Sequence, residues 1–513
     1  MQTGRVKIVA AAENNSNARK TYKRNFKVGR VYTDVREIDY SELKNEVDHV
    51  DIVIGGPPCQ GFSNANRQHT TIISMNNRLV KEYVRAVCEL EPKAFVMENV
   101  AMLRSQIHRF MVDEADISDE RIMGLPLQDE EVSILPANST FDGALAFINN
   151  TDGSSPDVWD EKLYQDIKVL YRFRINQEKF NAYLEKYKKR LLPRLESIIQ
   201  AVQGIDEPTA IQKSDLSMAQ AIIQYDVARE DFASVIFAIE RPLFMQRALL
   251  RMQELSDNHI HVYSYEENDT GIIARVKSYA VKDYIVAMLD GKYQLSESTL
   301  NALHYGAPQR RERFIIVGIH RELRKKFEAP EAVYTEDEYR TVRDAIADLE
   351  DKEPSFSVTA PYIEVAFRSN PSELEKELRS RFLYNHITTE TGEVAMSRFK
   401  ALKAGQNFHD LSPDLKSTYS NADRTQNTIY MRLKYDEPSG TVVNVRKSMW
   451  IHPVLDRAIS IREAARLQTF PDSFVFEGTK DSQYQQVGNA VPPFMAKAIA
   501  NNVIRILDNS TSE

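Results

Sequence analysis

The residues best suited to chemistry lie in one stretch, DIVIGGPPCQGFS, which runs from Asp51 to Ser63. Its apolar start predicts a buried strand, and the glycines and prolines that follow predict a stiff loop. That loop would present Cys59, whose thiolate is a candidate nucleophile. Open α/β sheets bind ligands at the carboxyl ends of their strands, which is where this loop would lie. A lone cysteine is more often an inert turn or core residue, so the assignment rests on the rest of the chain.

Two further groups of polar residues accompany predicted strands. AFVMENV, from Ala94 to Val100, delivers Glu98 to a strand end, and APQRRERFIIVG places Arg311 and Arg313 before another strand. A carboxyl group can exchange a proton, and a guanidinium can hold a carboxylate or a pyrimidine carbonyl in fixed geometry. Taken singly, the acid could equally be a solvated turn residue and the arginines a surface ion-pair cluster.

Five strings in one order resemble the cytosine C5 DNA methyltransferase family. They are GGPPCQGFS, MENV, PQRRERFIIVG, REAARLQTFPDSF and QVGNAVPP, and the resemblance covers about residues 5–100 and 281–508. It implies an enzyme that transfers a methyl group from S-adenosylmethionine to carbon 5 of a cytosine flipped out of double-stranded DNA. It also implies a role in restriction-modification or self-protection, with a recognised DNA sequence that the chain does not reveal.

The resemblance assigns a role to each of four residues. Cys59 would add to carbon 6 of the cytosine while Glu98 supplies or holds a proton at ring nitrogen N3, so that carbon 5 becomes nucleophilic enough to take a methyl group. This role requires a carboxyl group whose pKa is kept near neutral by burial. Arg313, and more distantly Arg311, would orient the carboxyl group and the base carbonyl.

The resemblance also indicates which residues bind the cofactor and the DNA. Glu13 and Asp34 each follow an apolar run, and carboxylates at such strand ends commonly bind ribose hydroxyls. Asp34 is similar to the acid that meets the adenine amino group, although a helix cap or turn is the alternative for both acids. The other cofactor residues that the family implies are Pro58, Asn489 and Val491. The DNA-binding residues that it implies are Gln60, Ser63 and Thr441.

One family motif has no counterpart in the chain. Family members open with a strand and a glycine-rich FxGxGG turn that closes over the methionine part of the cofactor, and nothing of this form precedes the strand that ends at Glu13. We therefore expect two open strand edges beside the active site. The explanations are a truncated or wrongly started reading frame, a split enzyme whose partner polypeptide supplies the strand, or a degenerate copy.

The motifs predict a doubly wound, Rossmann-like α/β sheet with its first strand missing. A helical pattern from Asn76 to Leu90 joins the Cys59 and Glu98 strands in a right-handed strand-helix-strand unit. Helical spacing after Phe180 indicates an insertion, whose basic run at 186–190 suits a solvated helix face better than DNA phosphates. The predicted parts are a catalytic core (1–100, 281–320 and 456–513), a mostly helical insertion (101–280) and a smaller target recognition domain (321–455).

Bulk composition constrains the partners and the location. The net charge of -8 excludes a uniformly basic coat but not a local positive face for DNA. No apolar run is long enough for a membrane span, and the first residues do not form a signal segment, so we expect a cytoplasmic protein of bacterial or phage origin. Two cysteines and the histidine spacing predict neither a disulfide framework nor a metal site.

Two other functions remain open from the sequence. The chain could be a DNA-binding subunit or a degenerate homologue that cannot methylate without a partner, as the absent glycine turn suggests and the four catalytic candidates oppose. It could also be an RNA cytosine methyltransferase built on the same motifs. The long region between Gly318 and Ile459 favours DNA over RNA.

Overall fold

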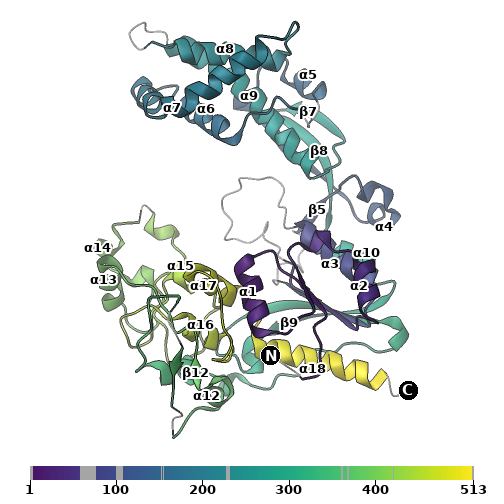
Figure 1. Ribbon diagram of the computed structural model, residues 1–513, viewed down its shortest axis with the longest axis vertical. Helices are drawn as coiled ribbons and strands as arrows, with labels where there is room; N and C mark the ends of the chain where they lie inside the picture. The colour runs from purple at the N-terminus through teal and green to yellow at the C-terminus, as the bar shows by residue number, and fades with distance from the viewer. Residues whose placement is uncertain are drawn as a thin grey trace. The chain divides into compact units, whose positions relative to one another are not determined.

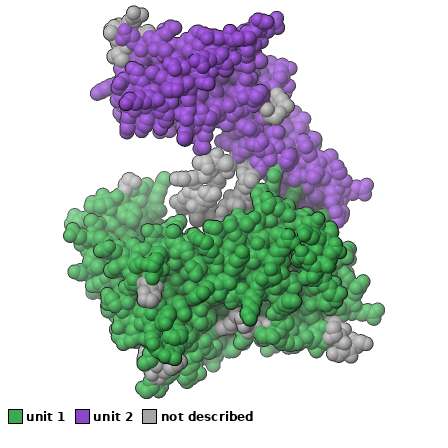
Figure 2. Space-filling view, viewed as in Figure 1, with its two compact units in different colours: residues 1–59, 78–105, 288–513 green, residues 60–77, 106–287 purple. Residues whose placement is uncertain are grey.

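The computed structural model describes residues 4–57, 77–99, 108–151, 153, 155–226, 232–359, 362–366, 369–419 and 421–510. The predicted site residues that lie outside these ranges are Pro58, Cys59, Gln60 and Ser63. The chain forms two compact units, shown in green and purple in Figure 2. Unit 1 comprises residues 1–59, 78–105 and 288–513, and unit 2 comprises residues 60–77 and 106–287.

Unit 1 contains a four-stranded sheet made of β3 (Ile52–Gly55), β4 (Ala94–Asn99), β9 (Tyr293–Asn301) and β10 (Glu312–His320). Across the sheet the order is β3-β4-β10-β9. β3 and β4 run parallel, as the predicted strand-helix-strand unit requires, and β10 lies antiparallel to both of its neighbours. β4 is buried at every position except Glu98, which matches its continuous apolar sequence.

A separate two-stranded parallel sheet holds β1 (Ala10–Ala12) and β2 (Arg30–Tyr32). Helix α1 (Ser16–Asn25), capped by the Asn15 side chain, joins these strands, and α2 (Tyr40–Glu46) leads from β2 to β3. Among the described residues, no strand pairs with the second edge of β1 or with the second edge of β3. The predicted single sheet is therefore split into two where its missing strand was expected.

Two helices cover opposite faces of the four-stranded sheet (Figure 1). The first, α3 (Asn77–Leu90), places Tyr83 edge-on against Phe95 of β4. The second, α18 (Pro493–Ser510), shares an apolar cluster with the neighbouring residue, Val96. Because successive side chains of a strand point to opposite faces, these contacts place one helix on each side. The sequence predicted both helices.

The second half of unit 1 is a set of short elements around a large apolar core that includes Trp450 and two smaller clusters, one around Phe399 and one around Leu383. Residues 321–455, predicted as a recognition domain, belong to the same compact unit as the sheet. The elements after β10 are α11 (Val342–Ile346), β11 (Ile363–Glu364), α12 (Glu373–Leu378), β12 (Phe382–Leu383), α13 (Glu393–Ala401), α14 (Pro413–Lys416), α15 (Val445–Ser448), α16 (Ile461–Leu467) and α17 (Lys480–Asn489).

Unit 2 combines helices with an antiparallel sheet. The helices are α4 (Glu120–Met123), α5 (Ala144–Asn149), α6 (Glu161–Arg172), α7 (Gln177–Val202), α8 (Ala210–Gln224) and α9 (Phe232–Asp257), and α10 (Val281–Leu289) leads on to β9. The strands are β5 (Arg109–Met111), β6 (Gln128–Pro136), β7 (Ser264–Asn268) and β8 (Gly271–Ala280). β8 pairs with the other three. The sequence predicted the helices but not this sheet, because the first half of β6, QDEE, lacks apolar alternation.

A buried carboxyl group ties an extended segment of unit 2 to its helices. Asp215 of α8 accepts a 2.8 Å hydrogen bond from the indole N–H of Trp159. The Gln246 side chain accepts the backbone N–H of Trp159 and donates to the backbone carbonyl of Asp157. The second oxygen of Asp215 has no hydrogen-bond partner among the described residues. Burial, with a smaller effect from Asp157, raises the pKa of Asp215 to about 7.

This raised pKa predicts that unit 2 loses stability as the pH rises. The folded state binds the Asp215 proton more tightly than the unfolded state, so the free energy of unfolding should fall between pH 4 and pH 7, by up to about 4 kcal/mol. Urea unfolding of the wild-type chain and of Asp215→Asn, followed by circular dichroism, tests this prediction. The asparagine variant should be the more stable protein at pH 8 and should show a flatter pH dependence. Equal pH profiles for the two proteins would contradict it.

Candidate active site

Glu98 and Arg313 form an ion pair where β4 ends and β10 begins. The Arg313 Nε lies 2.7 Å from Glu98 Oε1. The Arg313 side chain is 15% exposed and the Glu98 side chain is 21% exposed. Burial raises the pKa of Glu98 above its usual value, while Arg313 and Arg311 act in the opposite direction. The carboxyl group is thus held in place by an arginine and is still more easily protonated than an exposed glutamate.

Arg311 lies behind this pair and is 1% exposed. Its guanidinium donates from Nη1 to the Val442 carbonyl at 2.8 Å and from Nη2 to the Gly488 carbonyl at 2.9 Å. Burial and the positive charge of Arg313 together lower the pKa of Arg311 to about 9, although Glu98 acts in the opposite direction. Arg311 therefore joins three separate parts of unit 1, and its contribution to the site is to fix their positions.

The segment that carries Thr441 is fastened to the same strand. Thr441 Oγ1 donates to the Arg310 carbonyl at 2.6 Å. The fully buried Gln309 accepts the Val442 N–H at 3.1 Å and donates to the side chain of Gln468 at 2.7 Å. The motifs around residues 309–313, 441–442 and 486–489 meet here although they are far apart in the sequence.

Gly56 shows why the loop after β3 begins with glycines. A Cβ atom at position 56 would lie 2.8 Å from Glu98 Oε2, and one at Gly55 would lie 2.5 Å from the Tyr83 ring. Only glycine lets the backbone pass this close to the carboxyl group. The backbone carbonyl of Pro57 also accepts from Asn99 Nδ2 at 3.0 Å, which joins this loop to the end of β4.

Replacing Gly56 by alanine should therefore affect the site more than the fold. The clashing atom is the end of a flexible side chain, so Glu98 would move away from Arg313 at little cost in stability. We expect any methyl-transfer rate to fall by about tenfold or more, as misplaced catalytic groups cause, with a melting temperature close to that of the wild type. Gly291→Ala is the control, because nothing lies within 4 Å of its new Cβ atom. A large loss of stability in Gly56→Ala would contradict the prediction.

The two acids predicted to bind the cofactor follow β1 and β2. Glu13 Oε1 accepts the N–H of Asn15 at 2.8 Å. Asp34 caps a short 3₁₀ helix and binds the Arg36 guanidinium, whose hydrogen bonds lower the pKa of Asp34 to about 2. Both acids therefore make the local contacts that were the structural alternative, a turn contact for Glu13 and a helix cap for Asp34. Their role in cofactor binding stays a prediction.

Two other predicted cofactor residues, Asn489 and Val491, lie at the end of α17 and just after it. Asn489 is exposed and accepts from Gln485 Nε2 at 2.7 Å, while Val491 is half-buried against the cluster beneath the sheet. Gly488, just before them, packs so closely that an added Cβ would lie 2.5 Å from the Val443 backbone. The roles of Asn489 and Val491 also stay predictions, as do those of the four residues outside the described ranges.

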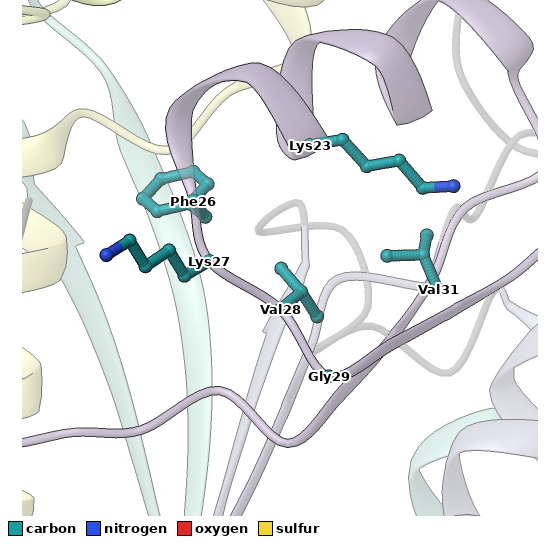
Figure 3. A pocket seen from close by; sticks show the side chains of 6 residues that line it. All are labelled: Lys23, Phe26, Lys27, Val28, Gly29 and Val31. Atoms are coloured by element: carbon teal, nitrogen blue, oxygen red, sulfur yellow. The ribbon is translucent and has the colours of Figure 1, made fainter.

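A hollow of about 490 Å³ lies away from these groups, between α1 and the start of β2. It is lined by Lys23, Phe26, Lys27, Val28, Gly29 and Val31. Figure 3 shows that Lys23 and Lys27 extend in different directions and do not converge on a common point. The hollow lies at the amino end of β2, whereas parallel sheets bind ligands at the carboxyl ends. We assign it no part in the chemistry.

The described residues contain neither a metal-binding cluster nor a helix suited to a membrane. No group of three or more His, Cys, Asp or Glu side chains there is arranged to hold a metal ion. No helix in those ranges has both the length and the apolar character needed to cross a membrane.

Sequence reasoning missed three contributors to this site. The motif PQRRERFIIVG contains Gln309 but does not indicate its role. The glycines allow either a positive φ or a close backbone approach at Gly56, and the helical spacing indicates only that Tyr83 faces the sheet. Their functions depend on contacts between remote segments, which a single sequence does not contain. The Gly-Gly pair was the available signal, since two adjacent glycines indicate a close backbone approach.

Comparisons with known proteins agree with this geometry. The family model described as C-5 cytosine-specific DNA methylase matches residues 1–115 and 265–505. The type II methyltransferase M.DdeI of Desulfomicrobium norvegicum is 32% identical over 261 residues, which cover 47% of this chain and 63% of that protein. M1.HphI of Haemophilus parahaemolyticus is 31% identical over 217 residues, 42% of this chain and 50% of the relative. The chain thus spans about half to two thirds of the length of these relatives.

A solved structure supports the fold. A prophage-encoded protein from E. coli, named as a DNA modification methyltransferase, aligns with 98% of this chain and 93% of its own length at a TM-score of 0.53 and 16% identity. At this identity the likeness shows the fold alone, a Rossmann-like methyltransferase architecture. The family match covers both parts of the sheet and the residues around Glu98, Arg311 and Arg313. The chain belongs to the C-5 cytosine-specific DNA methylase family.

Proposed function

We propose that this protein is a DNA (cytosine-5-)-methyltransferase that modifies a specific duplex sequence in restriction-modification or self-protection. The observation that carries the proposal is the Glu98–Arg313 pair, 2.7 Å apart, braced by the buried Arg311 at the carboxyl edge of the sheet. A carboxyl group that is oriented and easily protonated is what activation of a cytosine at N3 requires. The type II methyltransferases among its relatives support the same activity.

The chain's own residues divide the chemistry between them. Glu98 would hold the proton at N3 of the flipped cytosine, and this hydrogen bond makes carbon 6 more open to attack. Cys59, whose loop begins beside Glu98 at Gly56, would add to carbon 6 as a thiolate. Arg313 would keep the carboxyl group in one orientation and face the carbonyl of the base. Once carbon 5 carries the methyl group, its proton would pass to water and the thiolate would be eliminated from carbon 6.

The methyl group comes from S-adenosylmethionine when it is bound. Glu13 and Asp34 end or follow neighbouring parallel strands, which is the usual position of acids that bind the nucleoside part of a cofactor. Glu13 uses only its Oε1 oxygen in the hydrogen bond with Asn15, whereas both carboxylate oxygens of Asp34 accept hydrogen bonds from Arg36. Nothing among the described residues encloses the methionine end. We propose that a partner polypeptide completes this pocket.

DNA would be held by residues on both sides of the base pocket. We propose that Gln60 and Ser63 contact DNA and that Thr441 does so from a segment that is hydrogen-bonded to the Arg310 carbonyl, just before β10. The insertion's basic run offers a second surface, since Lys186, Lys188 and Lys189 on α7 are exposed, but no described contact favours DNA over solvent there. The location we propose, a bacterial or phage-infected cytoplasm, follows from this substrate.

Transfer of labelled methyl groups tests the function. The purified chain would be incubated with labelled S-adenosylmethionine and unmethylated genomic DNA, and the product nucleosides would be separated. Label in 5-methyldeoxycytidine is the expected result. Label only in a parallel RNA reaction would instead favour the RNA methyltransferase alternative. No label in either reaction would contradict the proposal.

A further inference from the structure

The outer side of helix α1 carries a row of positive charges. Its sequence, SNARKTYKRN, contains no acidic residue, and Lys20, Lys23 and Arg24 are all exposed. None of these three side chains forms an ion pair with another residue of the described ranges. Residues three and four apart lie on the same side of a helix, so the three charges are neighbours. In a chain of net charge -8, they form a local positive surface.

Other exposed arginines of unit 1 have acidic partners. Arg30 Nη1 lies 3.0 Å from Glu46 and 3.4 Å from Glu42, and Arg343 Nε lies 2.9 Å from Asp436. Such pairs neutralise the surface around each arginine. The row on α1 lacks this neutralisation, so its field reaches into the solvent and attracts anions.

The stability of α1 does not account for the whole row. Lys23 and Arg24 lie in the last turn, where positive charge favours the negative end of the helix dipole. Lys20 lies a turn earlier, where the dipole has little effect, and it stands three and four residues from the other two cations. Like charges at these spacings destabilise a helix. The clustering therefore indicates a partner rather than a gain in helix stability.

Hydrogen bonds fix α1 to the segment that leads into α17. The Thr21 hydroxyl accepts the Glu477 N–H at 2.8 Å. One turn later, the Asn25 side chain donates to the Val475 carbonyl at 2.8 Å and accepts the Val475 N–H at 2.9 Å. The side of α1 that bears Thr21 and Asn25 is therefore packed, and the cationic row lies outside this contact.

Helix α15, which follows Thr441, is also fixed to α17. Asp481 Oδ1 accepts from Asn444 Nδ2 at 3.3 Å and from Arg446 Nη1 at 3.1 Å. Because Asp481 balances the charge of Arg446, the cation left on α15 is Lys447, which is exposed and has no ion pair within the described part of the chain. Both α1 and α15 contact α17, and Figure 1 shows the three helices side by side.

We propose that Lys20, Lys23 and Arg24 of α1, together with Lys447 of α15, bind the phosphate backbone of duplex DNA beside the recognised sequence. We call these four residues the α1–α15 surface. A duplex that contacts Thr441 would meet α15 first and α1 next. Two helix widths of about 10 Å correspond to about six base pairs at 3.4 Å each, so the surface would extend the contact by about that length.

The chemistry of the α1–α15 surface favours a nucleic-acid backbone over a protein. Protein interfaces usually have an apolar centre, and α1 bears no exposed large apolar side chain. Lysine and arginine contacts to phosphate position a duplex without reading its bases. The surface should therefore strengthen binding to any duplex. Only the identity of the polyanion as DNA rests on the proposed function.

The salt dependence of DNA binding tests this surface without any measurement of methyl transfer. Two fluorescent duplexes of about 40 base pairs, unrelated in sequence, would be titrated with the full chain between about 50 and 200 mM salt. Each cation that contacts a phosphate steepens the fall of log affinity with log salt by about 0.9. Lys23→Gln combined with Arg24→Gln should make this slope shallower by about two and weaken binding at the lowest salt by about tenfold or more, equally for both duplexes.

A matched control removes the same charges elsewhere in unit 1. Lys497→Gln combined with Arg505→Gln also replaces one lysine and one arginine, at exposed positions of α18, and should keep the slope of the wild type. Lys447→Gln tests α15 separately and should make the slope shallower by about one. This third variant keeps the test decisive if the substitutions in α1 prevent folding.

Three results would overturn the proposal. If the α1 and α15 variants had the same slope as the α18 control, the row would be a solvated helix face, and the proposed function would still stand. If affinity fell for one duplex and not for the other, the residues would read bases rather than hold the backbone. If the wild-type chain bound neither duplex at the lowest salt, the result would count against the proposed function as well.

Discussion

A Glu98→Gln variant is expected to methylate DNA about 10²–10⁴-fold more slowly than the wild type, the range that general acid-base catalysis supplies. Glutamine can still accept the hydrogen bond that Arg313 Nε donates to Glu98 Oε1, so the geometry of the pair should survive. What is lost is a group that can carry the proton to N3. The loss should therefore appear in kcat, while KM for DNA changes by only a few fold.

The pH profile separates this role from a structural one. Burial raises the pKa of Glu98, so its carboxyl group stays protonated to a higher pH than an exposed glutamate does. The wild-type kcat/KM should fall as the pH rises through that pKa, and this fall should be absent in Glu98→Gln.

Glu297→Gln, at an exposed position of β9 in the same sheet, is the matched control and should keep both the methylation rate and the pH profile of the wild type. A Cys59→Ala variant gives the background methylation rate of the assay. A Glu98→Gln rate within about threefold of the wild type would contradict the assignment.

The sequence predicted this part of the molecule well because its signals are local. The apolar run before Glu98, the strand after Arg313 and the helical pattern from Asn76 to Leu90 all specify their own secondary structure. The family resemblance then placed Glu98 and Arg313 together, and they form an ion pair.

Contacts between remote segments could not be predicted in the same way. Arg311 reads as a charged residue beside a strand, yet it is buried and donates to carbonyls of residues 442 and 488. Val6 to Ala12 reads as one strand, but only Ala10–Ala12 pair with a neighbour. A strand without a partner on its second side loses the hydrogen bonds that would extend it. Tertiary context thus decides what the local pattern leaves open.

The polar residues of α16 show the same limit most clearly. The pattern IREAARLQ predicts a helix with one apolar face, but all seven residues of α16 are buried. Arg466 donates to both oxygens of Asp472 at 2.8 and 2.7 Å and also binds Asp348, and all three side chains are at most 4% exposed. The negative charges of the two aspartates raise the pKa of Arg466 despite its burial.

Replacing Arg466 by methionine is therefore expected to lower the free energy of unfolding of unit 1 by about 3–5 kcal/mol. The substitution keeps much of the side-chain volume but leaves Asp472 and Asp348 buried without their main counter-charge. Arg462 is the nearest remaining cation, 3.9 Å from Asp472. Urea unfolding, followed by the fluorescence of Trp450 in the same core, measures the loss.

The cause of that loss can be tested with two further variants. Arg321→Met removes a similar arginine-aspartate pair, with Asp290, whose side chains are 45% and 51% exposed, and should cost less than about 1 kcal/mol. Arg466→Met combined with Asp472→Leu removes both members of the buried pair and should recover part of the stability, because one uncompensated charge is gone. If Arg466→Met were as mild as Arg321→Met, the buried network would not be what holds α16 in the core. If the double variant were less stable than the single one, packing rather than charge would explain the loss.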